Sequence, residues 1–177
     1  TDGNPFFIEE VLKSLIANGD IFYADGAWDR KPITELHIPR SVRDAVQQRS
    51  TQLSEPARQV LQYAAVAGRR FNFGLLMELI HMNENELMRV IKELVAEQLV
   101  VEESADQFSF RHALTREAAY SALLIRERKK YHRTIAETME RLYVDSIDAH
   151  LTDLAYHFYQ AEAWEKALKY SERAGKK

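Results

Sequence analysis

Three helical patterns follow one another in the centre of the chain, and a strand pattern comes directly after them. The first begins at Ser54, a residue type that caps helix N-termini, and ends at Gly68. The second covers residues 73–82. The third covers 84–98 and follows Asn83, which has a glutamate three residues later, as in a capping box. This order limits the possible folds more strongly than composition does.

The strand pattern covers residues 99–112, where apolar and polar residues alternate around Ala105-Asp106. Such an alternation indicates two antiparallel strands joined by a tight turn. Three helices followed by a β-hairpin is the order of a winged helix. We therefore predict a winged-helix domain over residues 53–112.

The N-terminal part predicts a helical segment that carries a small hairpin. Asn18-Gly19 marks the end of the first helix, and Asp25-Gly26 is a two-residue turn signal between short strands at Ile21–Tyr23 and Ala27–Asp29. Another helical pattern begins at Val42 and ends near Ser54. The first helix should pack through one apolar face, formed by Phe7, Ile8, Val11, Leu12, Leu15 and Ile16.

The rest of the chain is helical in pattern. Residues 113–145 predict a helical linker, and residues 146–177 combine small alanines with large aromatic residues over two helices. That spacing resembles the start of a tetratricopeptide-type repeat, which needs neighbouring repeats to complete its core. The predicted fold class is thus mainly α: a helical segment over 1–52, the winged helix, the linker and a repeat-like helical hairpin.

Composition limits the function classes. The chain has 177 residues, 46% of them hydrophobic, and a formal net charge of −3, so no strong overall field favours nucleic acid or anionic lipid. It has no cysteine, which excludes disulfides and thiolate chemistry and suits a cytoplasmic location. Its apolar runs are too short to span a bilayer. Both ends have the character of a segment cut from a longer protein.

Winged helices often bind DNA, but the charges of this one argue against that use. The third helix carries four glutamates and two cations, and the strand pair adds three more acidic residues: Glu84, Glu86, Glu93, Glu97, Arg89, Lys92, Glu102, Glu103 and Asp106. Neutralisation of phosphates supplies most of the non-specific affinity for DNA, and an acidic surface repels them. The basic run at Arg126–Lys130 lacks interleaved aromatic residues and is interpreted as a solvated helix face.

No catalytic motif is present, so the chain is not expected to be an enzyme. It lacks a phosphate-binding loop, a zinc-protease motif and a glycine-rich dinucleotide turn. His150 and His157 lie seven residues apart and would share a helix face, yet no further metal ligand accompanies them. His112 stands out because it lies between a predicted strand and a predicted helix, where a histidine either caps, packs or faces a ligand.

The order and spacing of three segments resemble the C-terminal half of STAND-type signal-transduction ATPases. These segments are DGNPFFIEEVL at the start, IPRSVRDAVQQRSTQLSEPARQVLQYAAVAGRRF in the middle, and FSFRHALTREAAYSALLIRERKKYHRTIAETME later. The similar proteins are large ATP-binding regulators of LuxR type and ATPase modules attached to adenylate cyclase or protein kinase domains. The resemblance covers residue 1 to about residue 142.

This resemblance implies a nucleotide-binding core outside the chain, bound to ATP or ADP with Mg²⁺, followed by a helical lid, a winged helix and repeats that act as a sensor. Gly3 and Pro5 resemble the motif that opens the lid, whose proline lies against the adenine. His112 resembles the winged-helix histidine that reaches the β-phosphate of ADP. Arg111 and Ala113 differ from the methionine and aspartate that flank this histidine in animal and plant relatives.

The leading interpretation is therefore a regulatory segment of a nucleotide-dependent switch. Its partners would be the nucleotide-binding core, the downstream repeats and a protein or small-molecule inducer. Two alternatives stay open at this level: a transcription factor that binds DNA through the winged helix, and a scaffold whose terminal repeat recruits a protein.

Overall fold

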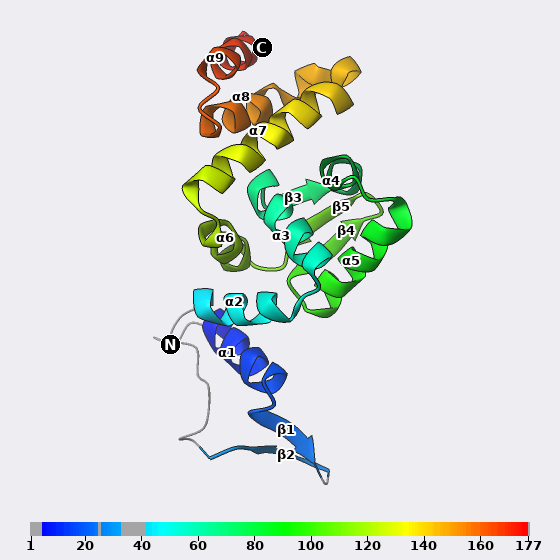
Figure 1. Cartoon of the computed structure of the whole chain (residues 1–177), viewed down its shortest axis with the longest axis vertical. Coiled ribbons are helices and arrows are strands. Elements are labelled where there is room, and N and C mark those ends of the chain that lie inside the picture. The colour runs from blue at the N-terminus through cyan, green and yellow to red at the C-terminus, as the bar shows by residue number, and fades with distance from the viewer. Residues whose placement is uncertain (1–4, 25, 33–41, 177) are drawn as a thin grey trace.

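A computed structural model describes residues 5–24, 26–32 and 42–176 of the chain. The protein is mainly helical with two small antiparallel sheets, and its elements follow one another along an elongated molecule (Figure 1). The N-terminal elements lie at one end and the last two helices at the other. None of the described helices combines the length and the apolar composition that crossing a membrane requires.

The N-terminal elements are two helices and a two-stranded hairpin. Helix α1 (Pro5–Ala17) is followed by β1 (Ile21–Ala24), β2 (Ala27–Arg30) and, after residues outside the described range, α2 (Val42–Gln52). The hairpin forms where the Asp25-Gly26 signal predicts it: Gly26 adopts a φ of +81°, a backbone conformation open to glycine, and the strands pair from Ile21 with Arg30 to Ala24 with Ala27. Both strands are one residue longer than predicted.

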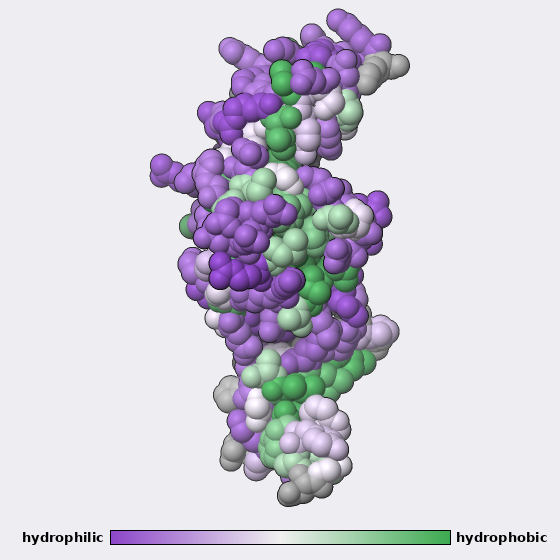
Figure 2. Space-filling view, turned by 90° about the vertical axis from the view of Figure 1, so that its right-hand side faces the viewer, coloured by the Kyte–Doolittle hydropathy of each residue, from purple (hydrophilic) through white to green (hydrophobic). Residues whose placement is uncertain are grey.

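The expectation that α1 buries one broad apolar face is wrong in part. Leu15 is buried, but Ile8, Leu12 and Ile16 lie four residues apart on a face that is more than two-fifths exposed. Together with Phe22, Tyr23 and Trp28 of the hairpin they leave apolar surface at this end of the molecule, where Figure 2 shows green residues gathered. The hydrophobic pattern predicts the apolar face of α1, but not how much of that face another element covers.

The central elements, Glu55 to Phe110, form three helices and a three-stranded sheet around one core. They are α3 (Glu55–Ala67), β3 (Arg70–Asn72), α4 (Phe73–Ile80), α5 (Glu84–Ala96), β4 (Val100–Ser104) and β5 (Gln107–Phe110). The sheet is antiparallel with the order β3-β5-β4, so the first strand pairs with the last. We call this part the central unit. The sequence does not predict β3, because three residues contain no readable alternation.

Local capping signals set the helix starts in the central unit. The Ser54 side chain accepts a hydrogen bond from the Ala57 amide at 3.3 Å, and Pro56 occupies the first turn of α3. At α5, the Asn83 side chain accepts from the Glu86 amide at 3.0 Å, and the Glu86 carboxylate accepts from the Asn83 amide at 3.2 Å. The predicted capping box is confirmed.

Replacing this cap gives a first test of the fold. Asn83→Ala should lower the free energy of unfolding by about 1 kcal/mol, because an amide at the start of α5 loses its acceptor. Asn85→Ala is the matched control, since Asn85 is exposed on the same helix and caps nothing. Urea denaturation of both variants measures the difference, and equal effects would remove the energetic role assigned to the cap.

The C-terminal part consists of five consecutive helical elements. They are α6 (Ala113–Ala122), α7 (Ile125–Leu142), the 3-10 segment η2 (Val144–His150), α8 (Leu151–Gln160) and α9 (Trp164–Gly175). Helices α8 and α9 are antiparallel neighbours beside α7, at one end of the molecule in Figure 1. We call α8 and α9 the C-terminal hairpin.

One apolar core runs from the central unit into the C-terminal hairpin. It includes Leu76, Leu87 and Leu94 in the central unit, and Ile135 and Phe158 in α7 and α8, all fully buried. This burial stabilises the packing of α7 against both parts. The apolar residues Val95 and Leu142, near the ends of α5 and α7, lie outside this core and are about two-fifths exposed.

Candidate functional site

His112 lies at the junction between β5 and α6, as the sequence predicts. It occupies the N-cap position of α6 in an extended conformation, and its backbone carbonyl accepts from the Thr115 amide at 3.1 Å. Its side chain makes no capping hydrogen bond and is half-buried. Capping is therefore not the reason for a histidine at this junction.

The backbone around His112 is fixed on both sides. The Phe110 amide donates to the Arg69 carbonyl at 3.0 Å, and the Arg111 amide donates to the Leu99 carbonyl at 3.0 Å. On the helix side, Arg116 donates from its Nε to the Ala65 carbonyl of α3 at 2.9 Å. The direction in which His112 leaves the backbone is thus set by the central unit.

Helix α1 reaches the same junction from the N-terminal part. Lys13 donates a hydrogen bond to Glu9, which lowers the pKa of Glu9, while burial opposes this shift and the charges of Lys13, His112 and Arg111 lower the pKa further. Helix α1 itself packs against α2 and β1. His112 and Arg111, at the end of β5, act on Glu9 of α1 through their charges.

The other two predicted site residues are not brought to this junction by any described contact. Pro5 is the first residue of α1 and is exposed. Gly3 lies outside the described residues. The structure thus places one of the three predicted residues, His112, at a defined junction.

Helix α2 connects the N-terminal part to the central unit on another side. Arg49 is buried, and its guanidinium donates to the Glu97 carbonyl at the C-terminal end of α5 at 2.9 Å. A cation at this position suits the negative end of the helix dipole. Arg49 therefore joins α2 to the end of α5.

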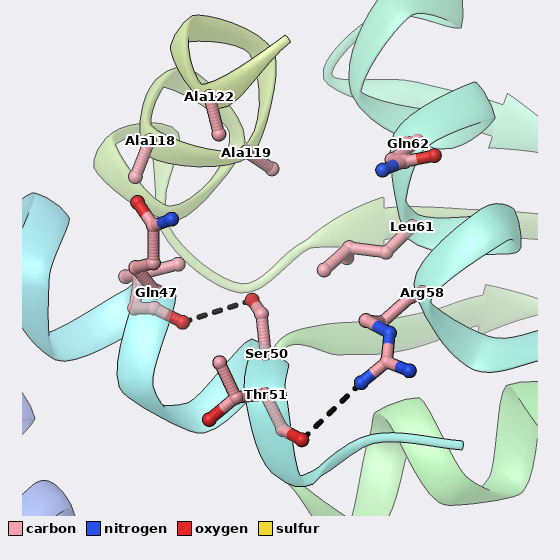
Figure 3. Close-up of a pocket in the computed structure, with 10 residues that line it drawn as sticks. Gln47, Ser50, Thr51, Arg58, Leu61, Gln62, Ala118, Ala119 and Ala122 are labelled. Atoms are coloured by element: carbon pink, nitrogen blue, oxygen red, sulfur yellow. Dashed lines mark hydrogen bonds between the residues drawn. The ribbon is translucent and has the colours of Figure 1, made fainter. Parts of the chain in front are cut away.

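A pocket of about 230 Å³ lies between α2, α3 and α6 (Figure 3). Three alanines of α6 form one wall, and Figure 3 shows Gln47, Ser50 and Thr51 of α2 facing Arg58 and Gln62 of α3. Several of these polar groups already have partners inside the chain: Arg58 donates to the Thr51 carbonyl at 3.2 Å and to Glu55 at 2.5 Å, and Gln62 accepts from the Tyr131 hydroxyl at 2.9 Å. The pocket is thus mainly a packing gap between helices.

Two histidines that the sequence did not mark as a pair meet in the interior. His132 of α7 and His157 of α8 are 1% and 3% exposed, and their Nδ1 atoms lie 2.8 Å apart. The Tyr120 hydroxyl of α6 lies 3.1 Å from Nε2 of His132. Burial lowers the pKa of His132 to about 4 and that of His157 to about 3, and the nearby Arg116 lowers both. Both rings are therefore neutral at pH 7.

This pairing also corrects the idea that His150 and His157 share a helix face. His150 belongs to η2 and stacks on Tyr143 with ring centres 4.0 Å apart, whereas His157 is hydrogen-bonded to His132. No group of three or more metal-ligating side chains occurs among the described residues. A readable signal for the pair did exist, because each histidine lies on the apolar face of its helix.

The candidate DNA-binding face is acidic in the structure as well. The glutamates Glu84 and Glu86 at the start of α5 and the hairpin residues Glu102 and Asp106 are exposed. Glu93 accepts hydrogen bonds from the Ser54 amide and hydroxyl at 2.7 Å, so it stabilises the start of α3.

Comparison with protein-family models, with curated proteins and with solved structures found no match to this chain.

Proposed function

We propose that the chain is the regulatory segment of a nucleotide-dependent switch of the STAND type. In this proposal residues 1–52 form a helical lid, 53–112 a winged helix, 113–145 a linker and 146–177 the start of tetratricopeptide-like repeats. The nucleotide-binding core, with ATP or ADP and Mg²⁺, belongs to another part of the same protein. The segment itself hydrolyses nothing and acts through its position.

The element order of the central unit supports the winged-helix assignment. Helix α3, the short strand β3, helices α4 and α5, and the β4–β5 pair follow one another, and β3 completes a three-stranded antiparallel sheet. The acidic α5 argues that this winged helix does not bind DNA directly, because phosphate oxygens would meet exposed glutamates. We infer that this unit instead makes contacts within the same protein.

The observation that carries the proposal is the position of His112. It is a half-buried histidine with a fixed backbone, no capping role, an exposed arginine beside it and α1 close by. A histidine N–H that donates to a diphosphate forms a charge-assisted hydrogen bond, and this bond exists only while the winged helix faces the nucleotide. ADP would then favour the closed arrangement, and an inducer bound to the repeats would favour release.

The test is ADP binding by a protein that includes the nucleotide-binding core. His112→Ala should weaken Mg-ADP binding by about 5- to 150-fold, the loss of about 1–3 kcal/mol expected for a hydrogen bond to a charged group. Isothermal titration calorimetry measures it, and the variant should also raise the signalling activity of the full protein.

His81→Asn is the matched control, because His81 is exposed at the end of α4 with a φ of +57°, a conformation that asparagine accepts. It should bind ADP as the wild type does. Equal ADP affinity in His112→Ala and His81→Asn would remove His112 from the nucleotide site. The scaffold and DNA-binding interpretations would then take precedence.

A further inference from the structure

Four groups from four helices form a continuous buried chain at the place where α3, α6, α7 and α8 meet. They are the Tyr120 hydroxyl, the His132 ring, the His157 ring and the Ala67 carbonyl, which we call the histidine chain. The two rings lie almost entirely out of solvent. Every polar atom in such a place needs a partner, because an unsatisfied buried donor or acceptor costs about 1–3 kcal/mol.

These contacts indicate where the protons of the histidine chain lie. The Ala67 backbone raises the pKa of His157 as a hydrogen-bond acceptor does, and Nδ1 of His157 faces His132, so we place the proton of His157 on Nε2. Nδ1 of His157 is then an acceptor, so Nδ1 of His132 donates to it. Nε2 of His132 in turn accepts from the Tyr120 hydroxyl. Both rings are neutral in this arrangement, and each of their nitrogens is satisfied.

An added proton breaks this order. If His157 were protonated on Nδ1, two N–H groups would face each other across 2.8 Å. The conflict disappears only if His132 moves its proton to Nε2, and then the Tyr120 hydroxyl must accept instead of donate. Even this rearranged chain holds a full positive charge in the interior, away from water.

The surroundings compensate that charge poorly: the backbone hydrogen bond with Ala67 raises the pKa of His157, but burial and the charges of His132 and Arg116 outweigh it. Arg116 of α6 raises the local positive potential at both rings, and Arg128 of α7 lies over the Tyr120 ring at 4.7 Å. Tyr156 of α8 contacts both imidazoles through its ring. From α4, which also packs against α7, the titratable side chains are Glu78 and His81, and both are exposed. Within the described part of the chain no carboxylate contacts the pair.

The histidine chain also connects α8 to other helices through polar groups. His157 joins α8 to α7 through His132 and to α3 through the Ala67 carbonyl. The C-terminal hairpin also contacts α7 through apolar side chains and through the buried Tyr170 hydroxyl, which donates to Glu140 at 2.6 Å. Ion pairs at the surface, Lys129–Glu162 and Lys166–Glu140, add to these contacts. Exposed pairs of this kind contribute about 0–1 kcal/mol.

We propose that the histidine chain is an acid-sensitive latch that holds the C-terminal hairpin against α3 and α7 while both rings are neutral and releases it when a ring gains a proton. All groups of the latch belong to this protein, and the latch does not depend on the proposed nucleotide switch. Opening exposes both rings to water, where imidazole takes up protons near pH 6.5. Mild acid therefore favours the open form without unfolding the central unit.

Hydrogen exchange on the full 177-residue chain tests the latch. Amide protection in α8 and α9, corrected for the intrinsic effect of pH, should fall by about 10- to 100-fold between pH 7.5 and pH 5.5. Protection in α3 and α5 should change far less. Unchanged protection in α8 and α9, or an equal loss throughout the chain, would overturn the proposal.

Two variants separate the pair from other histidines. His132→Asn with His157→Asn removes both titrating rings and leaves amides that can bond to each other, so the pH dependence of α8 and α9 should disappear. His150→Asn is the control, because His150 lies in the neighbouring η2 segment and does not belong to the histidine chain. This variant should keep the wild-type response. A response that persists in the double variant would assign the opening to other groups.

A second measurement needs no variant. Nitrogen-15 NMR of the wild-type histidines at pH 7.5 should find His132 protonated on Nδ1 and His157 on Nε2, because the chain of hydrogen bonds requires these tautomers. The Nδ1–H form is distinguished from the Nε2–H form by the shifts of the two ring nitrogens. Finding both histidines as Nε2–H tautomers would exclude the hydrogen bond between them and with it the latch.

Discussion

The free energy of unfolding should fall by roughly 2–4 kcal/mol when the pH is lowered from 7 to 5, an unusually large change for a window above the range in which carboxylates titrate. His132 and His157 cause it. Burial lowers their pKa values to about 4 and about 3 in the folded protein, whereas the ordinary histidine value is 6.5. In the unfolded chain both rings take up protons as the pH falls below 6.5.

The sign follows from proton counting. Between pH 6.5 and the folded pKa values the unfolded state binds more protons than the folded state, so acid favours unfolding. The stabilisation is fully present above pH 6.5 and is lost as the pH falls toward 4. Glu9, whose pKa is lowered mainly by its hydrogen bond with Lys13, acts in the same direction but only below its ordinary value of 4.5.

Urea denaturation followed by circular dichroism at several pH values measures this slope. The double variant His132→Asn with His157→Asn should show a nearly flat profile between pH 7 and pH 5, and His150→Asn should keep the wild-type slope. A flat wild-type profile would mean that both rings already titrate normally in the folded protein. The global measurement complements hydrogen exchange, which locates the opening in the C-terminal hairpin.

Local signals in the sequence predict the structure correctly. Ser54, Asn83 with Glu86, and Gly26 act on backbone groups within three or four residues, and the caps and the turn form where these residues predict them. The mainly helical fold class is also confirmed, because the helical period repeats over many residues and is therefore easy to recognise.

Structure that depends on a partner distant in sequence has no such local signal. Strand β3 exists because Arg70 to Asn72 pair with β5, more than thirty residues later, and three residues alone carry no pattern. His132 and His157 are 25 residues apart, and only the packing of α7 on α8 brings their rings together. A histidine on the apolar face of each helix was the available hint, since Ile135 and Leu154 beside them are fully buried.

At the candidate site, too, local patterns predict some features and long-range packing determines the others. The position of His112 between a strand and a helix follows from local patterns, so the sequence predicts it correctly. The approach of α1 to this junction, seen in the effect of His112 on Glu9, depends on tertiary packing that no local pattern describes. The same holds for Arg49 at the end of α5, a buried cation in a helix whose sequence looks surface-exposed.

Phe110→Ala should lower the free energy of unfolding by about 3–5 kcal/mol, the largest effect expected for a single substitution here. Phe110 is 1% exposed in β5, and its ring meets Phe71 of β3 edge to face with centres 5.8 Å apart. Phe110 packs with Phe71 and Phe108 in the hydrophobic core, so the cavity left by its ring would lie in the core against this sheet. Urea denaturation at pH 7.5 measures the loss.

Phe22→Ala is the matched control, because Phe22 lies on the exposed N-terminal hairpin. This variant should change the unfolding free energy by less than about 1 kcal/mol.

The same two variants also test what positions His112, which follows Phe110 by two residues. If the sheet sets the direction of the histidine, Phe110→Ala should weaken ADP binding by the full protein even under conditions where the variant stays folded, whereas Phe22→Ala should not. A destabilised but fully ADP-binding Phe110→Ala would mean that the position of His112 is held by α6 and not by the core of the central unit.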